Sequence, residues 1–129
     1  MDVLIRYGFS IEEIKNMIDS NEEIGNISDN DIYSLIDFLG SVGCLSSNIK
    51  NIFITNPFCI SKNLNDIEKL IKKFKELELD NINLLLDINP YILNISYETI
   101  NKKYLELKKE GFSKEKITEY FFYESVELI

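Results

Sequence analysis

Residues 49–61, IKNIFITNPFCIS, and residues 82–94, INLLLDINPYILN, decide the fold of this chain. Each stretch places apolar residues three and four positions apart, as on one face of a helix, before it reaches an Asn-Pro pair. The two pairs, at 56–57 and 89–90, lie 33 residues apart. Proline is tolerated at the first position of a helix or turn, so each pair predicts that one helix ends and a short turn begins. The regular spacing indicates a repeat protein.

Glycines follow the same period. The tripeptide Gly-Phe-Ser stands at 8–10 and again at 111–113, and Gly43 lies 35 residues after the first of these glycines. Glu78 takes the place of a glycine after another 35 residues. The units are therefore predicted to start near residues 8, 43, 78 and 111. In the first unit, Asn21 stands where the next two units have the asparagine of the Asn-Pro pair.

The longer helix of each unit is predicted by apolar residues at the spacing i, i+3, i+4 and i+7, which is typical of an amphipathic helix with one buried face. These residues are Ile32, Leu35, Ile36 and Leu39 in one unit and Ile67, Leu70, Ile71 and Phe74 in the next. Helix starts are predicted by N-cap serines at 10, 28, 96 and 113, and Ser10 with Glu13 matches a capping box.

These patterns predict an all-α fold, an α-solenoid of about three 33–35-residue helical repeats. Each repeat has two helices and a short Asn-Pro turn, and partial units stand at both ends. We expect residues 1–129 to form a single helical-repeat domain. No strand alternation or Asn-Gly hairpin signal competes with this interpretation.

The composition excludes several classes of function. The 129 residues include no histidine, which excludes His-dependent triads, His-ligated metal sites and imidazole acid–base catalysis. Residues 29–31, Asp-Asn-Asp, lack the following glycine and glutamate that a calcium loop requires. No pattern fixes two carboxylates in one pocket. We therefore expect no enzyme, no cofactor and no metal site.

The sequence also predicts the compartment. Residues 1–6 show no basic leader before an apolar stretch, and no apolar run approaches the length of a membrane span. Cys44 and Cys59 form no C-x-x-C pair. A disulfide between them is one alternative, but we expect two reduced, packed thiols in a cytoplasmic protein with no membrane contact.

Four stretches together resemble a known family: GFSIEEIKNMI from 8, FLGSVGCLSSNIKNIFITNPFCIS from 38, LLLDINPYILNIS from 84 and GFSKEKITEYFF from 111. They are similar to the mitochondrial transcription termination factor (mTERF) repeat, in which a short helix leads to Asn-Pro and then to a longer helix. The resemblance covers nearly the whole chain and indicates a short, bacterial-type member. It implies a superhelix of units with two α-helices and a short 3₁₀ turn. It also implies nucleic-acid binding along a basic concave face, in some members together with protein partners.

Charge bears on the nucleic-acid hypothesis, because phosphate contacts need local positive potential. The net charge is −8, but residues 1–61 carry three basic and nine acidic side chains, whereas residues 62–129 carry eleven and thirteen. Lysines at equivalent places in the two later long helices predict a nucleic-acid-binding surface. The candidates are Lys69, Lys72, Lys73, Lys75, Lys102, Lys103, Lys108 and Lys109. The alternative is a solvated helix face on which glutamates are interspersed.

The aromatic segment at 120–123 suggests a second surface. In the repeat frame Tyr120 and Phe121 fall on core positions, whereas Phe122 stands where other units carry aspartate. An uncovered apolar surface there would seek a protein partner or a second copy of the chain. Its candidate residues are Phe122, Val126, Leu128 and Ile129. The alternative is a locally repacked end.

Two functions follow from these observations. The first is a non-enzymatic helical-repeat module for protein interaction or regulatory scaffolding, which self-associates or binds a partner through its C-terminal end. The alternative is a nucleic-acid-binding transcription regulator, similar to a termination factor, that uses the lysine-bearing face. Acidic charge favours the first, and family resemblance favours the second.

Overall fold

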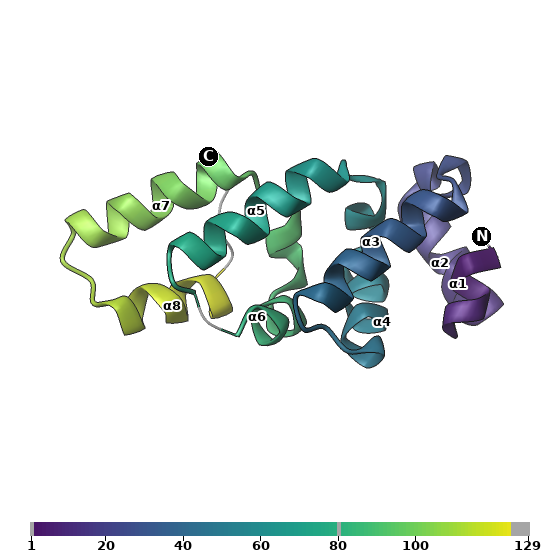
Figure 1. The fold of residues 1–129 in the computed structure, drawn as a ribbon, viewed down its shortest axis with the longest axis horizontal. Coiled ribbons are helices and arrows are strands. Elements are labelled where there is room, and N and C mark those ends of the chain that lie inside the picture. Colours follow the sequence, from purple (N-terminus) through teal and green to yellow (C-terminus); the bar gives the residue numbers. More distant parts are fainter. Residues whose placement is uncertain (1, 80, 125–129) are drawn as a thin grey trace. The chain divides into compact units, whose positions relative to one another are not determined.

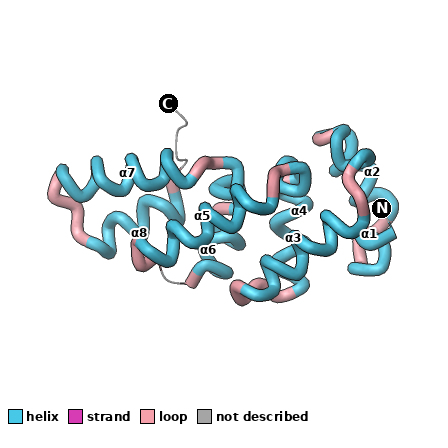
Figure 2. The backbone as a smooth tube through the Cα atoms, turned by 45° about the horizontal axis from the view of Figure 1, so that its top comes forward, coloured by secondary structure: helices cyan, strands magenta, loops and turns pink. Residues whose placement is uncertain are grey.

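The chain is helical throughout the part that its computed structural model describes, residues 2–79 and 81–124 (Figure 1). These residues form α-helices and short 3₁₀ helices joined by loops, and no strand occurs among them (Figure 2). The prediction of an all-α helical-repeat fold is confirmed. The chain divides into two compact units, an N-terminal unit, Met1–Leu64, and a C-terminal unit, Asn65–Ile129.

The N-terminal unit begins with a short helix. Two further short helices follow, each with a 3₁₀ helix after it, and one longer helix lies between them in the sequence. In chain order its elements are α1 (Asp2–Tyr7), α2 (Ile11–Ser20), η1 (Glu22–Asn26), α3 (Asp29–Ser41), α4 (Ser46–Thr55) and η2 (Pro57–Ser61). Helix α3 packs against α1 and α4, and α2 packs against α4 and η2. The short helix of one repeat thus lies beside the short helix of the next.

The C-terminal unit continues the same order of elements. It comprises α5 (Leu64–Glu76), α6 (Ile82–Ile88), η3 (Pro90–Asn94), α7 (Tyr97–Lys109) and α8 (Lys114–Tyr123). Helix α8 packs against both α6 and α7. The proline of each Asn-Pro pair is the first residue of its 3₁₀ helix, as the sequence predicts.

Serine side chains begin four of the helices. The hydroxyls of Ser10, Ser28, Ser96 and Ser113 each accept a hydrogen bond from the backbone N–H three residues on. At the start of α2 the bond is reciprocal, because the Glu13 carboxylate accepts from the Ser10 N–H at 2.8 Å. The predicted caps and the capping box are confirmed, and each supplies a partner for an N–H that the helix itself leaves free.

The core of each unit is the predicted apolar stripe. Ile32, Leu35, Ile36 and Leu39 are buried in α3, and Ile67, Leu70, Ile71 and Phe74 are buried in α5. Burial of one such side chain contributes about 1.5–3 kcal/mol. Cys44 and Cys59 are also buried, and they are not joined by a disulfide, as expected. Among the described residues, no helix is long and apolar enough to cross a membrane.

Left-handed residues separate the long helices from the short ones. Gly8, Gly43 and Gly111 have φ values of 109°, 103° and 91°. Glu78, at the corresponding place, has a φ of 59° and therefore pays the steric penalty that glycine avoids. The glycine period in the sequence thus reflects a backbone conformation repeated before each short helix.

Candidate binding surfaces

An asparagine side chain ties neighbouring repeats together in the N-terminal unit. Asn21 follows α2 and is only 7% exposed. Its amide nitrogen donates hydrogen bonds to the Pro57 carbonyl at 3.2 Å and to the Ser61 hydroxyl at 2.9 Å, both in the following repeat. Its amide oxygen accepts from the Glu23 N–H at 3.3 Å and so caps η1. One side chain therefore both starts a turn and fixes the next repeat against it.

The C-terminal unit repeats this link. The Asn89 amide nitrogen donates to the Phe121 carbonyl at 2.9 Å and to the Glu124 carbonyl at 3.4 Å, across to α8 and the residue after it. Asn56, at the equivalent place, is fully buried. Asn21 and Asn89 are thus connectors between repeats as well as turn residues. These links set how the surfaces of successive repeats line up.

Helix α5 presents lysines on the sides that its core stripe leaves free. Lys69, Lys72 and Lys75 are exposed. Lys73 is half-buried and pairs with Glu76, with 3.0 Å between the ammonium nitrogen and the carboxylate oxygen. Four lysines and three acidic residues give this helix a net charge of +1.

Helix α7 lies in the next repeat and runs in nearly the same direction as α5 (Figure 1). Lys102, Lys108 and Lys109 are exposed. Lys103 is half-buried, 3.6 Å from a Glu106 oxygen and 5.5 Å from the ring centroid of Tyr120. Four lysines and two acidic residues give α7 a net charge of +2.

Several of these lysines keep their charge available to a ligand. Lys108 lies 5.8 Å from the ring of Tyr104. It forms no ion pair with a described residue, although its charge, after that of Lys114, helps to lower the pKa of Glu78. No ion pair to a described residue is formed by Lys69, Lys72, Lys75, Lys102 or Lys109 either. We call these six residues the lysine surface. Lys73 and Lys103 are not included, because each forms an ion pair with a glutamate on its own helix.

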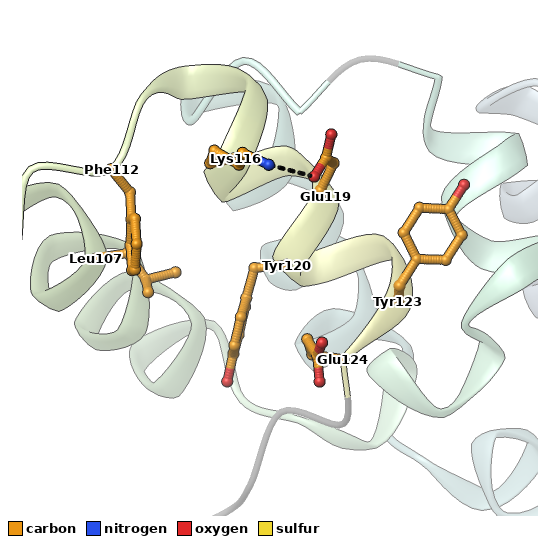
Figure 3. Close-up of a pocket in the computed structure, with 7 residues that line it drawn as sticks. All are labelled: Leu107, Phe112, Lys116, Glu119, Tyr120, Tyr123 and Glu124. Atoms are coloured by element: carbon orange, nitrogen blue, oxygen red, sulfur yellow. Dashed lines mark ion pairs between the residues drawn. The ribbon is translucent and has the colours of Figure 1, made fainter.

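A pocket of about 240 Å³ opens between the end of α7 and the length of α8 (Figure 3). Its lining is Leu107, Phe112, Lys116, Glu119, Tyr120, Tyr123 and Glu124. The only ion pair among the side chains drawn joins Lys116 to Glu119 at 3.5 Å. Four of the seven lining residues are apolar or aromatic and three are charged, with two carboxylates against one ammonium, which suits a side chain better than a phosphate. No group of three or more potential metal ligands occurs among the described residues.

The sequence of the whole helical array decides the family. A family model described as mTERF matches residues 1–123. The chain belongs to the mTERF family. No curated protein and no solved structure matches it.

In the C-terminal aromatic segment of this mTERF chain, Phe122 does not have the exposure that an uncovered apolar surface would require. Phe122 is 8% exposed, and its ring centroid lies 6.0 Å from that of Tyr123. Its ring is thus packed and offers no apolar surface to a partner. Val126, Leu128 and Ile129 lie outside the described residues.

Sequence reasoning missed two features of this mTERF fold. It treated the recurring asparagines as turn residues, although the persistence of Asn21 without a following proline was a signal of a further role. It also placed Tyr120 in the core, whereas this side chain is half-buried and lines the pocket. Phe121, its neighbour, is fully buried, as predicted.

Proposed function

We propose that this mTERF protein is a non-enzymatic binding module that holds a nucleic acid against the lysine surface of α5 and α7. The family suggests nucleic-acid binding, and the carrying observation is a set of exposed lysines without carboxylate partners on two successive long helices. A regulatory role in transcription, similar to that of a termination factor, is the finer form of this proposal.

Lysines of this kind suit a phosphate backbone. Each is an exposed ammonium on a flexible stem, and it contacts phosphate as a point charge without reading base sequence. Because the chain as a whole carries −8, most of its surface repels a polyanion. We therefore expect weak, salt-sensitive binding that is confined to the C-terminal unit and has little sequence preference.

Fluorescence anisotropy with labelled single-stranded DNA, duplex DNA and RNA of equal length tests the proposal between 25 and 200 mM salt. If four to six phosphates are neutralised, the plot of log affinity against log salt should have a slope of about −4 to −5 on a duplex. The absence of binding at the lowest salt to all three probes contradicts the proposal.

A matched pair of variants tests the location. Lys69→Glu with Lys102→Glu changes the net charge by the same amount as Arg6→Glu with Lys62→Glu, at sites outside the lysine surface. We expect the first pair to weaken binding by roughly tenfold or more and to reduce the salt slope by about 2, and the second pair to change affinity much less. Equal losses would mean that total charge, and not this surface, controls binding.

The pocket beside α8 favours a second candidate function, protein interaction. Phe112 and Tyr123 on its wall are 46% and 69% exposed, and an exposed group of aromatic side chains is typical of an interaction site. The scaffold function expected from the sequence would use this pocket and not the lysine surface. This function is tested without nucleic acid, by measuring whether the purified chain binds a second copy of itself or another purified mTERF chain.

A further inference from the structure

Phe112 is exposed, although the side chains at the equivalent positions of the other repeats are buried. The equivalent residues are Phe9, Cys44 and Leu79, which are 3%, 6% and 2% exposed, whereas Phe112 is 46% exposed. All four follow the left-handed residue that precedes a short helix. Because Phe9 and Phe112 both follow a glycine with positive φ and precede an extended N-cap serine, the difference between them lies in what covers the side chain.

The N-terminal unit shows what covers such a side chain. Phe9 stacks on Phe53, with ring centroids 6.0 Å apart and planes inclined by 16°. Phe53 belongs to α4, the short helix of the following repeat, and is fully buried. Lys50 of the same helix also lies over the Phe9 ring, 5.5 Å from its centroid. By comparison, the site beside Phe112 would receive an apolar side chain and a neighbouring lysine from another short helix. No described residue takes that place, and the pocket lined by Phe112 and Tyr120 remains there.

Helix α2 carries the matching feature. Ile18 is the residue of the first repeat that corresponds to Phe53, and also to Leu86 and Phe121. Those three are fully buried, but Ile18 is only partly buried. Ile11 lies seven residues earlier, hence on the same side of α2, and is 78% exposed. This side of α2, on which the exposed Lys15 stands between the two isoleucines, has no covering repeat among the described residues.

We propose that Ile11 and Ile18 on α2 of one chain dock into the Phe112–Tyr120 pocket of a second copy, so that the chains associate head to tail. This contact between two molecules would resemble the packing of Phe53 on Phe9 within one molecule. Both halves of the joint are present on the same chain, which is why the occupant is a second copy.

Charge supports the same partner. Residues 2–26, which include α2, carry six acidic and two basic side chains. Helix α7, on one side of the pocket, carries a net charge of +2. An acidic α2 repeat and a lysine-bearing α7 attract each other, so association should weaken as salt is added, although the pocket-lining residues Glu119 and Glu124 limit this effect.

A head-to-tail contact is heterologous, and this property makes a sharp test. Ile11→Asp disables only the α2 face, and Phe112→Asp disables only the pocket. Sedimentation velocity on the full chain without nucleic acid should show concentration-dependent association of the wild type. Each variant alone should be monomeric, with a dissociation constant raised at least tenfold. An equimolar mixture of the two variants should form dimers and nothing larger, because one intact joint remains.

The controls keep the test decisive. Tyr91→Asp, at a residue in η3 that is 56% exposed, should associate like the wild type. Helical circular dichroism shows whether each variant is folded, and Ile11→Asp, at a largely exposed position, still tests the joint if Phe112→Asp does not fold. A monomeric wild type at high concentration overturns the proposal. A mixture that stays monomeric overturns it as well.

Discussion

Replacing Asn21 with alanine removes three hydrogen bonds from one buried site. Two of them reach the following repeat, at the Pro57 carbonyl and the Ser61 hydroxyl, and the third caps η1 through the Glu23 N–H. The side chain is 7% exposed, so water cannot readily replace the lost partners. We therefore expect the substitution to loosen α2 and η2 against each other.

The expected loss follows from these contacts. A net contribution of about 1 kcal/mol for each of the two inter-repeat bonds, and about 0.5–1 kcal/mol for the cap, gives about 2.5–3 kcal/mol. For a chain of this size, such a loss lowers the melting temperature by roughly 10 °C. Asn89→Ala should lose less, about 1–2 kcal/mol, because its side chain is only half-buried and one of its bonds is 3.4 Å long.

Urea unfolding followed by circular dichroism measures the free energy of unfolding. Asn16→Ala is the matched control, since Asn16 is exposed on α2 and alanine there can only favour the helix. Hydrogen exchange adds the location, because Asn21→Ala should raise exchange in α2 and η2 before it affects α7. An Asn21→Ala chain within about 0.5 kcal/mol of the wild type would show that the asparagine links do not hold the repeats together.

Two further predictions concern single side chains. Burial raises the pKa of the Cys59 thiol from its ordinary value of 9.0 to about 12, so in a Cys44→Ala chain it should react with a thiol reagent at pH 8 only as fast as the chain unfolds. The native thiol keeps its proton where the unfolded one ionises, so this residue's contribution to stability should be present below pH 9 and be lost between pH 9 and 12. Glu78→Gly should raise the free energy of unfolding by about 1 kcal/mol, because glycine adopts a φ of 59° without strain. Lys114→Ala measures separately what the 2.8 Å ion pair to Glu78 contributes, and a lower stability of Glu78→Gly than of Lys114→Ala would contradict the strain argument.

Local patterns predicted the helices because their causes are local. The stripe from Ile32 to Leu39 and the caps at Ser10 and Ser113 depend on residues within one or two helical turns, which the sequence displays directly. The Asn-Pro pairs predicted, for the same reason, the short turns that are 3₁₀ helices in the structure. Membership of the mTERF family followed from these features taken together over most of the chain.

The contacts between repeats were not predictable in the same way. Asn21 finds its partners 36 and 40 residues away, and nothing near it in the sequence names them. Tyr120 matches buried residues in the repeat frame, yet burial at that position depends on a following repeat and not on the residue itself. Phe112 shares its tripeptide with Phe9 and is nevertheless exposed, again because the neighbour decides. A repeat frame predicts which side chains face a neighbour, but not whether a neighbour is there.

The lysine surface and the head-to-tail joint together predict multivalent binding of a long nucleic acid. Each copy in a head-to-tail assembly brings its own lysines, so a long nucleic acid would be held at several sites and a short one at a single site. Phe112→Asp should then bind a short duplex as the wild type does, but lose affinity and cooperativity on a long one. The Lys69→Glu and Lys102→Glu chain should lose affinity for both lengths and still self-associate. Equal binding of short and long duplexes by the wild type, at a protein concentration where it associates, would show that the two surfaces work independently.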